Sequence, residues 1–188
     1  MTVDTHALVE EKLTTGEELF AMNNVERCEL VEGKLVPMSP TGELHGSYEG
    51  NFYYAIRSFL YDQNIGKVRV GEVGIYIKRN PDTIRAADVL FISNERYAQK
   101  KSKSYLDVAP ELVVEVLSPA DSLSEVMQKL REYFSIGVRL VWVADPQAKI
   151  VYAYRSMTDV REFTADDELP GDDVLPGFAV KVAALFED

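Results

Sequence analysis

Two carboxylates lie within two of the most apolar stretches of the chain, and this placement constrains the fold more than any other feature. Asp88 stands in the run Ala86–Ile92, and Glu115 stands in the run Leu112–Leu117. Each run is typical of a strand that is apolar on both faces. Because an ionised carboxylate taken out of water is costly unless it is compensated, the two acids predict a shared partner, most simply a metal ion.

The composition is that of one soluble globular domain. The chain has 188 residues, of which 46% are hydrophobic and 27% are charged. No apolar run approaches the roughly 18 residues that a membrane-spanning helix needs. We expect a single domain over residues 1–188 with an N-terminal extension over 1–13, which lacks the apolar segment of a signal peptide. The expected location is the cytoplasm.

The cysteine count and the net charge exclude several classes of protein. Cys28 is the only cysteine, which excludes an intrachain disulfide framework and a multi-cysteine zinc module. The net charge of −11 argues against a protein that coats nucleic acid non-specifically, because such binding relies on Lys and Arg. A local basic cleft remains compatible with this charge.

The predicted elements alternate as in a mixed α/β fold. Capping-box spacing at Thr15–Glu18 and at Ser122–Glu125 opens two helices, and the apolar spacing over Glu43–Gln63 predicts the longest helix. The Glu115 strand is joined through a helix to a strand over Leu140–Ala144, which predicts a right-handed parallel crossover. A hairpin is expected over 29–36, and further strands are expected at 68–70, 73–77 and 150–154.

The two acids predict a metal site if their strands are neighbours in one sheet. Asp88 and Glu115 would then aim at one point, where Mg²⁺ (or Mn²⁺) fits a set of oxygen ligands. The alternative is a pair of carboxylates that lie at strand ends or bind arginine. Lys129 on the next helix could orient or help deprotonate an attacking water. Its alternative is a solvated lysine that pairs with Glu125 four residues earlier.

The ordered polar positions of the chain resemble the Uma-two family of "putative restriction endonucleases". This family is similar to the PD-(D/E)XK nuclease superfamily, which implies a restriction-endonuclease-like mixed β-sheet flanked by helices. It also implies Mg²⁺-dependent hydrolysis of DNA phosphodiester bonds. The resemblance runs from about Thr14 to Phe186 and lies in Cys28–Val36, Met38-Ser39-Pro40 with His45, Ala87-Asp88-Val89, Glu115–Pro119, Lys129 with Tyr133, Val141–Pro146 and Leu175–Phe178.

The resemblance carries roles to five residues. Asp88 and Glu115 match the metal carboxylates, and Lys129 matches a lysine on the following helix. Glu29 and His45 match further recurrent polar positions with supporting roles. From the residues alone, His45 is a candidate general base or a packing histidine. Glu29 faces either solvent or the site.

Two departures from the superfamily motif bear on the activity. Leu117 stands where the motif places its lysine, two residues after the second acid, and Ala87 replaces the usual proline before the first acid. Catalysis therefore depends on Lys129 reaching the site. The leading hypothesis is a Mg²⁺-dependent DNA endonuclease that acts as a homodimer. The rival is a catalytically silent nuclease-fold binding or scaffold domain, also homodimeric.

Overall fold

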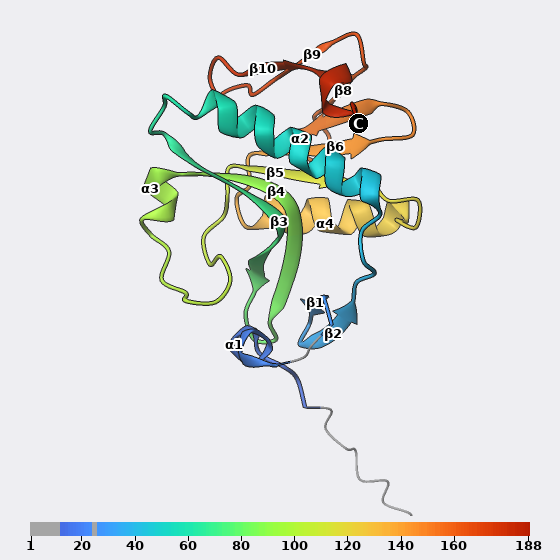
Figure 1. Ribbon diagram of the computed structural model, residues 1–188. Coiled ribbons are helices and arrows are strands. Elements are labelled where there is room, and N and C mark those ends of the chain that lie inside the picture. The colour runs from blue at the N-terminus through green and yellow to red at the C-terminus, as the bar shows by residue number, and fades with distance from the viewer. Residues whose placement is uncertain (1–11, 24–25) are drawn as a thin grey trace, which may run out of the picture.

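A computed structural model describes residues 12–23 and 26–188 (Figure 1). Most of the predicted N-terminal extension lies outside these residues, so the assignment of the whole chain to one domain stays a prediction. Within the described residues, no helix has the length and apolar character to cross a membrane. The helices are α1 (Gly16–Ala21), α2 (Glu43–Phe59), α3 (Asn94–Tyr97), α4 (Leu123–Ser135) and α5 (Val182–Leu185).

The described strands form one large mixed sheet and a small antiparallel ribbon. They are β1 (Cys28–Val31), β2 (Lys34–Pro37), β3 (Gly66–Lys78), β4 (Thr83–Ser93), β5 (Leu112–Val116), β6 (Leu140–Asp145), β7 (Ile150–Tyr154), β8 (Val160–Phe163), β9 (Glu168–Pro170) and β10 (Ala179–Lys181). The large sheet has the order β2-β1-β4-β5-β6-β7-β8, with β3 paired to β4. β9 and β10 make the ribbon.

Local sequence signals account for the first residues of α1 and α4. Both capping boxes form, with the side chains of Thr15 and Ser122 accepting from the N–H groups of Glu18 and Glu125. α2 is the longest helix and ends four residues before the predicted end at Gln63. α4 connects β5 to β6, which run parallel as predicted.

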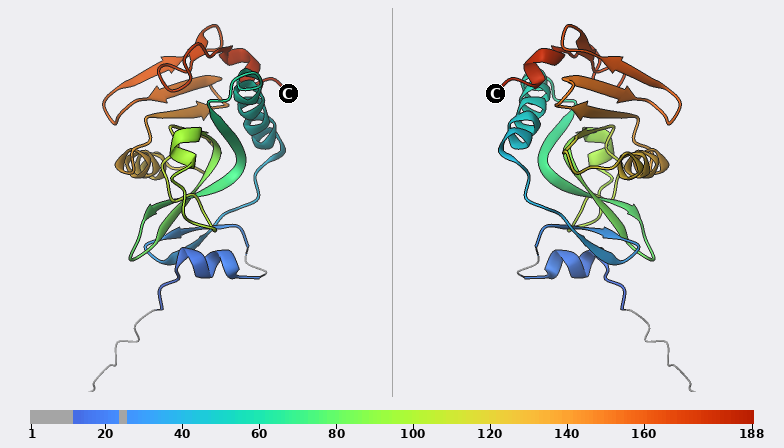
Figure 2. Two further views of the ribbon diagram at one scale, coloured as in Figure 1. Left: turned by 90° about the vertical axis from the view of Figure 1, so that its left-hand side faces the viewer. Right: turned by 90° about the vertical axis from the view of Figure 1, so that its right-hand side faces the viewer.

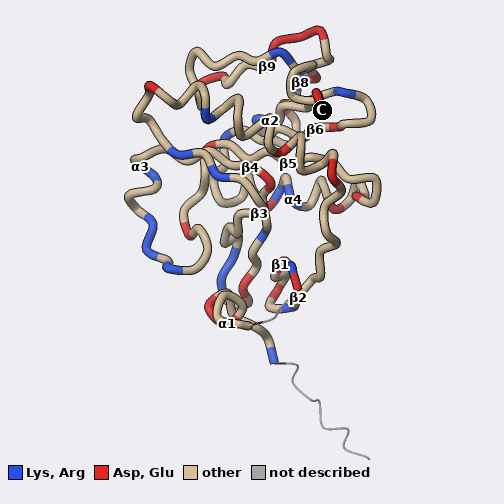
Figure 3. The backbone as a smooth tube through the Cα atoms, viewed as in Figure 1, with Lys and Arg blue, Asp and Glu red and all other residues tan. Residues whose placement is uncertain are grey.

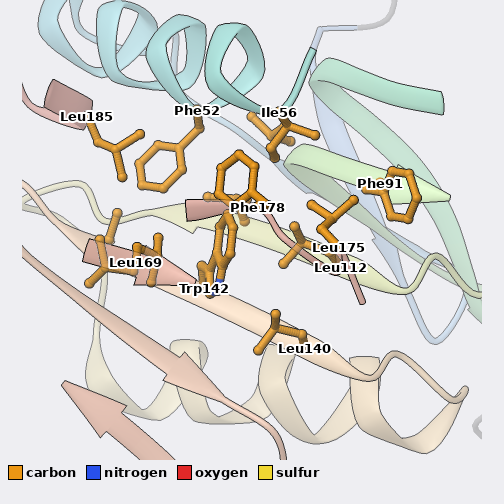
Figure 4. Close-up of a cluster of buried hydrophobic side chains, with 14 of the residues drawn as sticks. Phe52, Ile56, Phe91, Leu112, Leu140, Trp142, Leu169, Leu175, Phe178 and Leu185 are labelled. Carbon is orange, nitrogen blue, oxygen red and sulfur yellow. The ribbon is translucent and has the colours of Figure 1, made fainter. Parts of the chain in front are cut away.

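Two layers cover the sheet. α2 and the C-terminal segment lie on one face, and α4 lies on the other (Figures 1 and 2). On the α2 face, Phe52 and Ile56 pack over β5 and β6, and Trp142 stacks on Phe178 with ring centroids 5.8 Å apart (Figure 4). On the α4 face, Val113 packs with the helix, and this is the side of the strand that carries Glu115. β5 is therefore buried on both faces, as predicted.

The two strands predicted at 68–70 and 73–77 are one strand, β3, which bends at a bulge. Val70 pairs with Val89 and Val73 pairs with Ala87, so β3 has one residue more than β4 in this interval. Glu72 and its glycine neighbour take positive φ values there. The prediction of a break was wrong because the bulge interrupts the residue pattern without ending the ladder.

Candidate active site

The two predicted metal carboxylates lie where the sheet divides. β4 pairs with β5 through Val89–Phe91 and with β1 at Ile84, so β1 and β5 share one edge of β4. One more step of the β4–β5 register would pair Asp88 with Glu115, but the ladder ends there. Asp88 Oδ2 instead accepts a hydrogen bond from the Val116 N–H at 2.7 Å. We call this opening between β1 and β5 the fork.

Glu115 is held at the fork by two donors from one face of α4. Lys129 Nζ donates to Glu115 Oε2 at 2.8 Å, and the Tyr133 hydroxyl donates to Glu115 Oε1 at 2.6 Å. Lys129 and Tyr133 are four residues apart, so one helix face presents both. Burial lowers the pKa of Lys129, but the carboxylates of Glu115 and Glu29 outweigh burial and raise it. Lys129 is therefore a cation that faces the fork.

Glu29 enters the fork from β1 and is buried. Its Oε1 accepts from the Ala86 N–H at 3.0 Å and lies 3.5 Å from Lys129 Nζ, and its Oε2 accepts from Arg85 at 2.6 Å. Arg85 also donates to both carboxylate oxygens of Glu132 on α4. Of the two expectations for Glu29, the structure has the one in which it faces the site.

His45 reaches Asp88 from the first turn of α2. Its Nε2 lies 2.8 Å from the Val116 carbonyl oxygen and 3.7 Å from Asp88 Oδ2. Its Nδ1 lies 2.8 Å from Glu49 Oε1, yet these two buried atoms are not aligned as a hydrogen bond. Glu49 and then Asp88 raise the pKa of His45 against the opposing effect of burial. Ligand atoms of His45, Glu49 and Asp88 all lie within 4.8 Å of one another.

The acids at the fork exceed the cations that neutralise them. Figure 3 shows acidic and basic segments of β4, β5 and α4 close together. The ion pairs of Lys129 and Arg85 go to glutamates of β1, β5 and α4, whereas Asp88 and Glu49 lie beside His45. Burial, and then the charge of Glu115, raises the pKa of Asp88 to about 8. A divalent cation would supply the missing positive charge on the Asp88 side.

The donor atoms at the fork suit a hard or borderline divalent cation. Asp88 and Glu49 offer carboxylate oxygens, which Mg²⁺ and Mn²⁺ accept, and His45 offers a nitrogen, which favours Mn²⁺ over Mg²⁺. The two oxygens of Glu115, the other predicted metal ligand, accept from Lys129 and Tyr133. A cavity of about 30 Å³ between β5 and α4, lined by Glu115 and Lys129, has room for a water molecule. The buried residues therefore fit a metal-assisted hydrolytic site.

Glu49, Arg85 and Tyr133 take part in the site although no role was predicted for them. Glu49 stands four residues after His45, which places both on one helix face and is the signal that could have found it. Tyr133 belongs to the family resemblance, and its spacing from Lys129 carries the same signal. Arg85 gives no local signal, because its partners Glu29 and Glu132 come from distant segments.

Tyr133→Phe is expected to lower the melting temperature by roughly 3–6 °C, because a buried Glu115 oxygen loses its hydroxyl donor at a cost of about 1–2 kcal/mol. The phenyl ring keeps its packing in the core of the α4 face. Differential scanning calorimetry measures the change. Tyr54→Phe is the matched control, since the Tyr54 side chain is 72% exposed and its variant should melt with the wild type. Equal melting of all three proteins would show that the Tyr133–Glu115 bond adds no stability.

Comparisons with known proteins agree with the fold. The family described as "Putative restriction endonuclease" (Uma2) matches residues 16–183. A crystal structure of "a putative nuclease belonging to DUF820 from Anabaena variabilis" superposes with a TM-score of 0.75 at 20% identity, covering 92% of this chain and 97% of that one. None of the curated proteins compared with the chain matches it. The predicted mixed sheet flanked by helices is confirmed, and the chain belongs to the Uma2 family of putative restriction endonucleases.

Proposed function

We propose that this protein is an endonuclease that hydrolyses DNA phosphodiester bonds with Mg²⁺ or Mn²⁺. The observation that carries the proposal is the position of Lys129, which donates to Glu115 at 2.8 Å inside the fork. A catalytically silent binding or scaffold domain would not require a half-buried lysine beside two acids, and Lys129 directed to solvent would have favoured it. Membership in the Uma2 family supports the same choice.

Asp88 and Glu115 would hold the cation, and His45 with Glu49 would complete its surroundings on the α2 side. When bound, a divalent cation polarises a phosphoryl oxygen and eases deprotonation of an attacking water. The misaligned pair of His45 Nδ1 and Glu49 Oε1 supports this assignment, because a buried acceptor facing a carboxylate needs a proton or a cation between them. His45 in this arrangement is a ligand or a proton carrier next to Asp88.

Lys129 would stabilise negative charge and orient water, and it would not act as a base. Two carboxylates raise its pKa, so the amine stays protonated at neutral pH and can only donate. Its three N–H groups reach Glu115, come close to Glu29 and leave one donor for a phosphate oxygen or a water. Glu29, which Arg85 fixes, would then hold the ammonium in place.

Metal-dependent nicking of supercoiled plasmid DNA tests the proposal directly. The wild type should convert plasmid to the open circle in MgCl₂ or MnCl₂ and should stop when EDTA is added. Asp88→Ala and Glu115→Ala should lose this activity while keeping the circular dichroism spectrum of the wild type. Equal nicking by all three proteins would reject the assignment.

We also propose that the protein is a homodimer. β2 ends the large sheet, and its Leu35 and Val36 side chains are exposed, so a second copy could cover this edge. Sedimentation velocity measures the mass in solution. A Leu35→Glu variant that stays dimeric would rule out this edge as the interface.

A further inference from the structure

We propose that a groove beside the fork binds an unpaired nucleobase, so that the substrate is DNA with unpaired nucleotides at the cleavage position. This inference rests on the proposed nuclease function and names its substrate class. The groove has a volume of about 610 Å³, which is within the usual range for a small-molecule site. The start of α2, the loop after β5 and the turn after β6 line it (Figure 1). We call it the acidic groove.

The acidic groove repels phosphates. Its acidic side chains are Glu43, Asp121 and Asp145, and no lysine or arginine of the described chain lines it. The N-terminus of α2, which has no side-chain cap, opens on the groove, but Glu43 in the first helical turn opposes its partial positive charge. A nucleic-acid backbone gains nothing from such a surface, because its affinity comes from cations that neutralise phosphates. A part of the substrate that enters the groove is therefore a neutral one.

A base satisfies the chemistry of the acidic groove. Leu44, Tyr48 and Pro146 provide apolar and aromatic surface for a ring, as in proteins that bind single strands. The acids supply acceptors for amino and imino groups on a base edge. Asp145 Oδ1 accepts from the N–H groups of Gln147 and Ala148, which fixes the carboxylate of this lining residue.

The acidic groove lies next to the proposed cleavage site. His45 lines the groove, and its Nε2 lies 3.7 Å from Asp88 Oδ2 at the fork. A phosphate bound at Asp88 therefore has its neighbouring nucleoside at the groove. A base that inserts its ring into the groove and turns its Watson–Crick edge to the acids must be unpaired, as in a single strand, a loop or an extruded base. Guanine, with an imino and an amino donor on one edge, suits a carboxylate best, and thymine, with one donor, suits it least.

The test compares cleavage of short labelled oligo-dT strands that carry one central dG, dC or dA with cleavage of the all-dT strand in MnCl₂. Each strand is used alone and annealed to its complement. We expect cleavage beside the inserted base, about tenfold faster for dG than for dT, and slower cleavage of every duplex. Glu43→Gln combined with Asp145→Asn should bring the dG-to-dT ratio close to one. Asp62→Asn removes the same kind of charge from an exposed position outside the groove and should keep the ratio.

Two results would overturn the inference and leave the nuclease function standing. One is equal cleavage of single strands and duplexes. The other is a dG-to-dT ratio near one in the wild type. A change in sedimentation caused by Glu43→Gln and Asp145→Asn would assign the groove to a second copy of the chain and would also overturn it.

A binding measurement tests the proposal for the groove independently of the proposed nuclease function. If the wild type cuts no nucleic acid with any metal, the nuclease proposal fails. Fluorescence anisotropy of the same strands in EDTA then still decides on the groove. Tighter binding of the dG strand than of the all-dT strand, lost in the Glu43→Gln and Asp145→Asn double variant, would support it. Equal binding of both strands would reject it.

Discussion

Lys129→Met is expected to slow metal-dependent DNA cleavage by roughly 100- to 1,000-fold, the loss that follows removal of one preorganised donor from a reacting centre. The ammonium of Lys129 lies 2.8 Å from Glu115 and 3.5 Å from Glu29, so it faces the position that a scissile phosphate would take beside the acid pair. Methionine keeps the length and packing of the side chain but cannot donate. Initial rates at saturating Mn²⁺ measure the effect.

A second substitution tests whether a lysine at the usual motif position can replace Lys129. Leu117 follows Glu115 by two residues and lines the same small cavity as Lys129. Leu117→Lys in the Lys129→Met background is expected to regain at least about tenfold in rate, because a flexible ammonium from the residue that follows β5 reaches the same space. Recovery would show that the amine at this point matters and that its origin on α4 does not.

The control for this series is Lys181→Met, which removes an exposed lysine of β10, remote from the fork, and should cleave like the wild type. Lys129→Met leaves Glu115 and Glu29 with one fewer cation, so its melting temperature must be measured beside its rate. Full activity of a folded Lys129→Met protein would remove Lys129 from the mechanism. It would also return the silent scaffold domain as the better explanation of the buried acids.

The proximity of Asp88, Glu115 and Lys129 was predictable because local rules determine most of it. Each acid interrupts an apolar run, which places it on a buried strand. The capping box at Ser122 sets the first residue of α4 and therefore the face on which Lys129 lies. That face meets the Glu115 side of β5, because a crossover helix packs on the sheet that it connects.

The other half of the site was not predictable because it depends on contacts between distant segments. The hairpin pattern around Glu29 is the same whether that side chain faces solvent or the fork, and only the pairing of β1 with β4 decides between them. Glu49 is a polar residue on a helix whose apolar residues set the predicted pattern. Its burial follows from the approach of α2 to Asp88. The fork itself arises because β1 and β5 occupy the same edge of β4, an arrangement that no local signal encodes.

Asp88→Asn is expected to stabilise the metal-free protein at pH 8 while removing its response to metal. The folded protein raises the pKa of Asp88 to about 8, above the value of about 3.9 expected in the unfolded chain. The folded state therefore binds this proton more tightly, and stability falls as pH rises from about 4 to about 8. Asparagine keeps an oxygen for the Val116 N–H and carries no charge to bury.

The measurement is the difference in melting temperature between Asp88→Asn and the wild type from pH 5.5 to 8.5, in EDTA and in MnCl₂. In EDTA the melting temperature of the variant should rise relative to that of the wild type as pH rises. The difference should reach roughly 5–10 °C at pH 8, because one pKa unit corresponds to about 1.4 kcal/mol. His45, whose pKa Glu49 and Asp88 raise, adds a loss of stability in the same direction, and this loss is smaller in Asp88→Asn because the charge of Asp88 is absent. The difference between the proteins therefore measures Asp88 together with its interaction with His45.

Bound metal should reverse the order of the two melting temperatures. A cation that binds the folded state raises the melting temperature in proportion to its affinity, and Asp88 must be ionised to bind it. Mn²⁺ should therefore stabilise the wild type, more at pH 8 than at pH 6, and should leave Asp88→Asn unchanged. Asp62→Asn, at an exposed position, should follow the wild type in every buffer. The charge of Asp88 should destabilise the metal-free protein and should stabilise the protein when a cation is bound. Equal stabilisation of Asp88→Asn and the wild type by Mn²⁺ would therefore place the cation elsewhere.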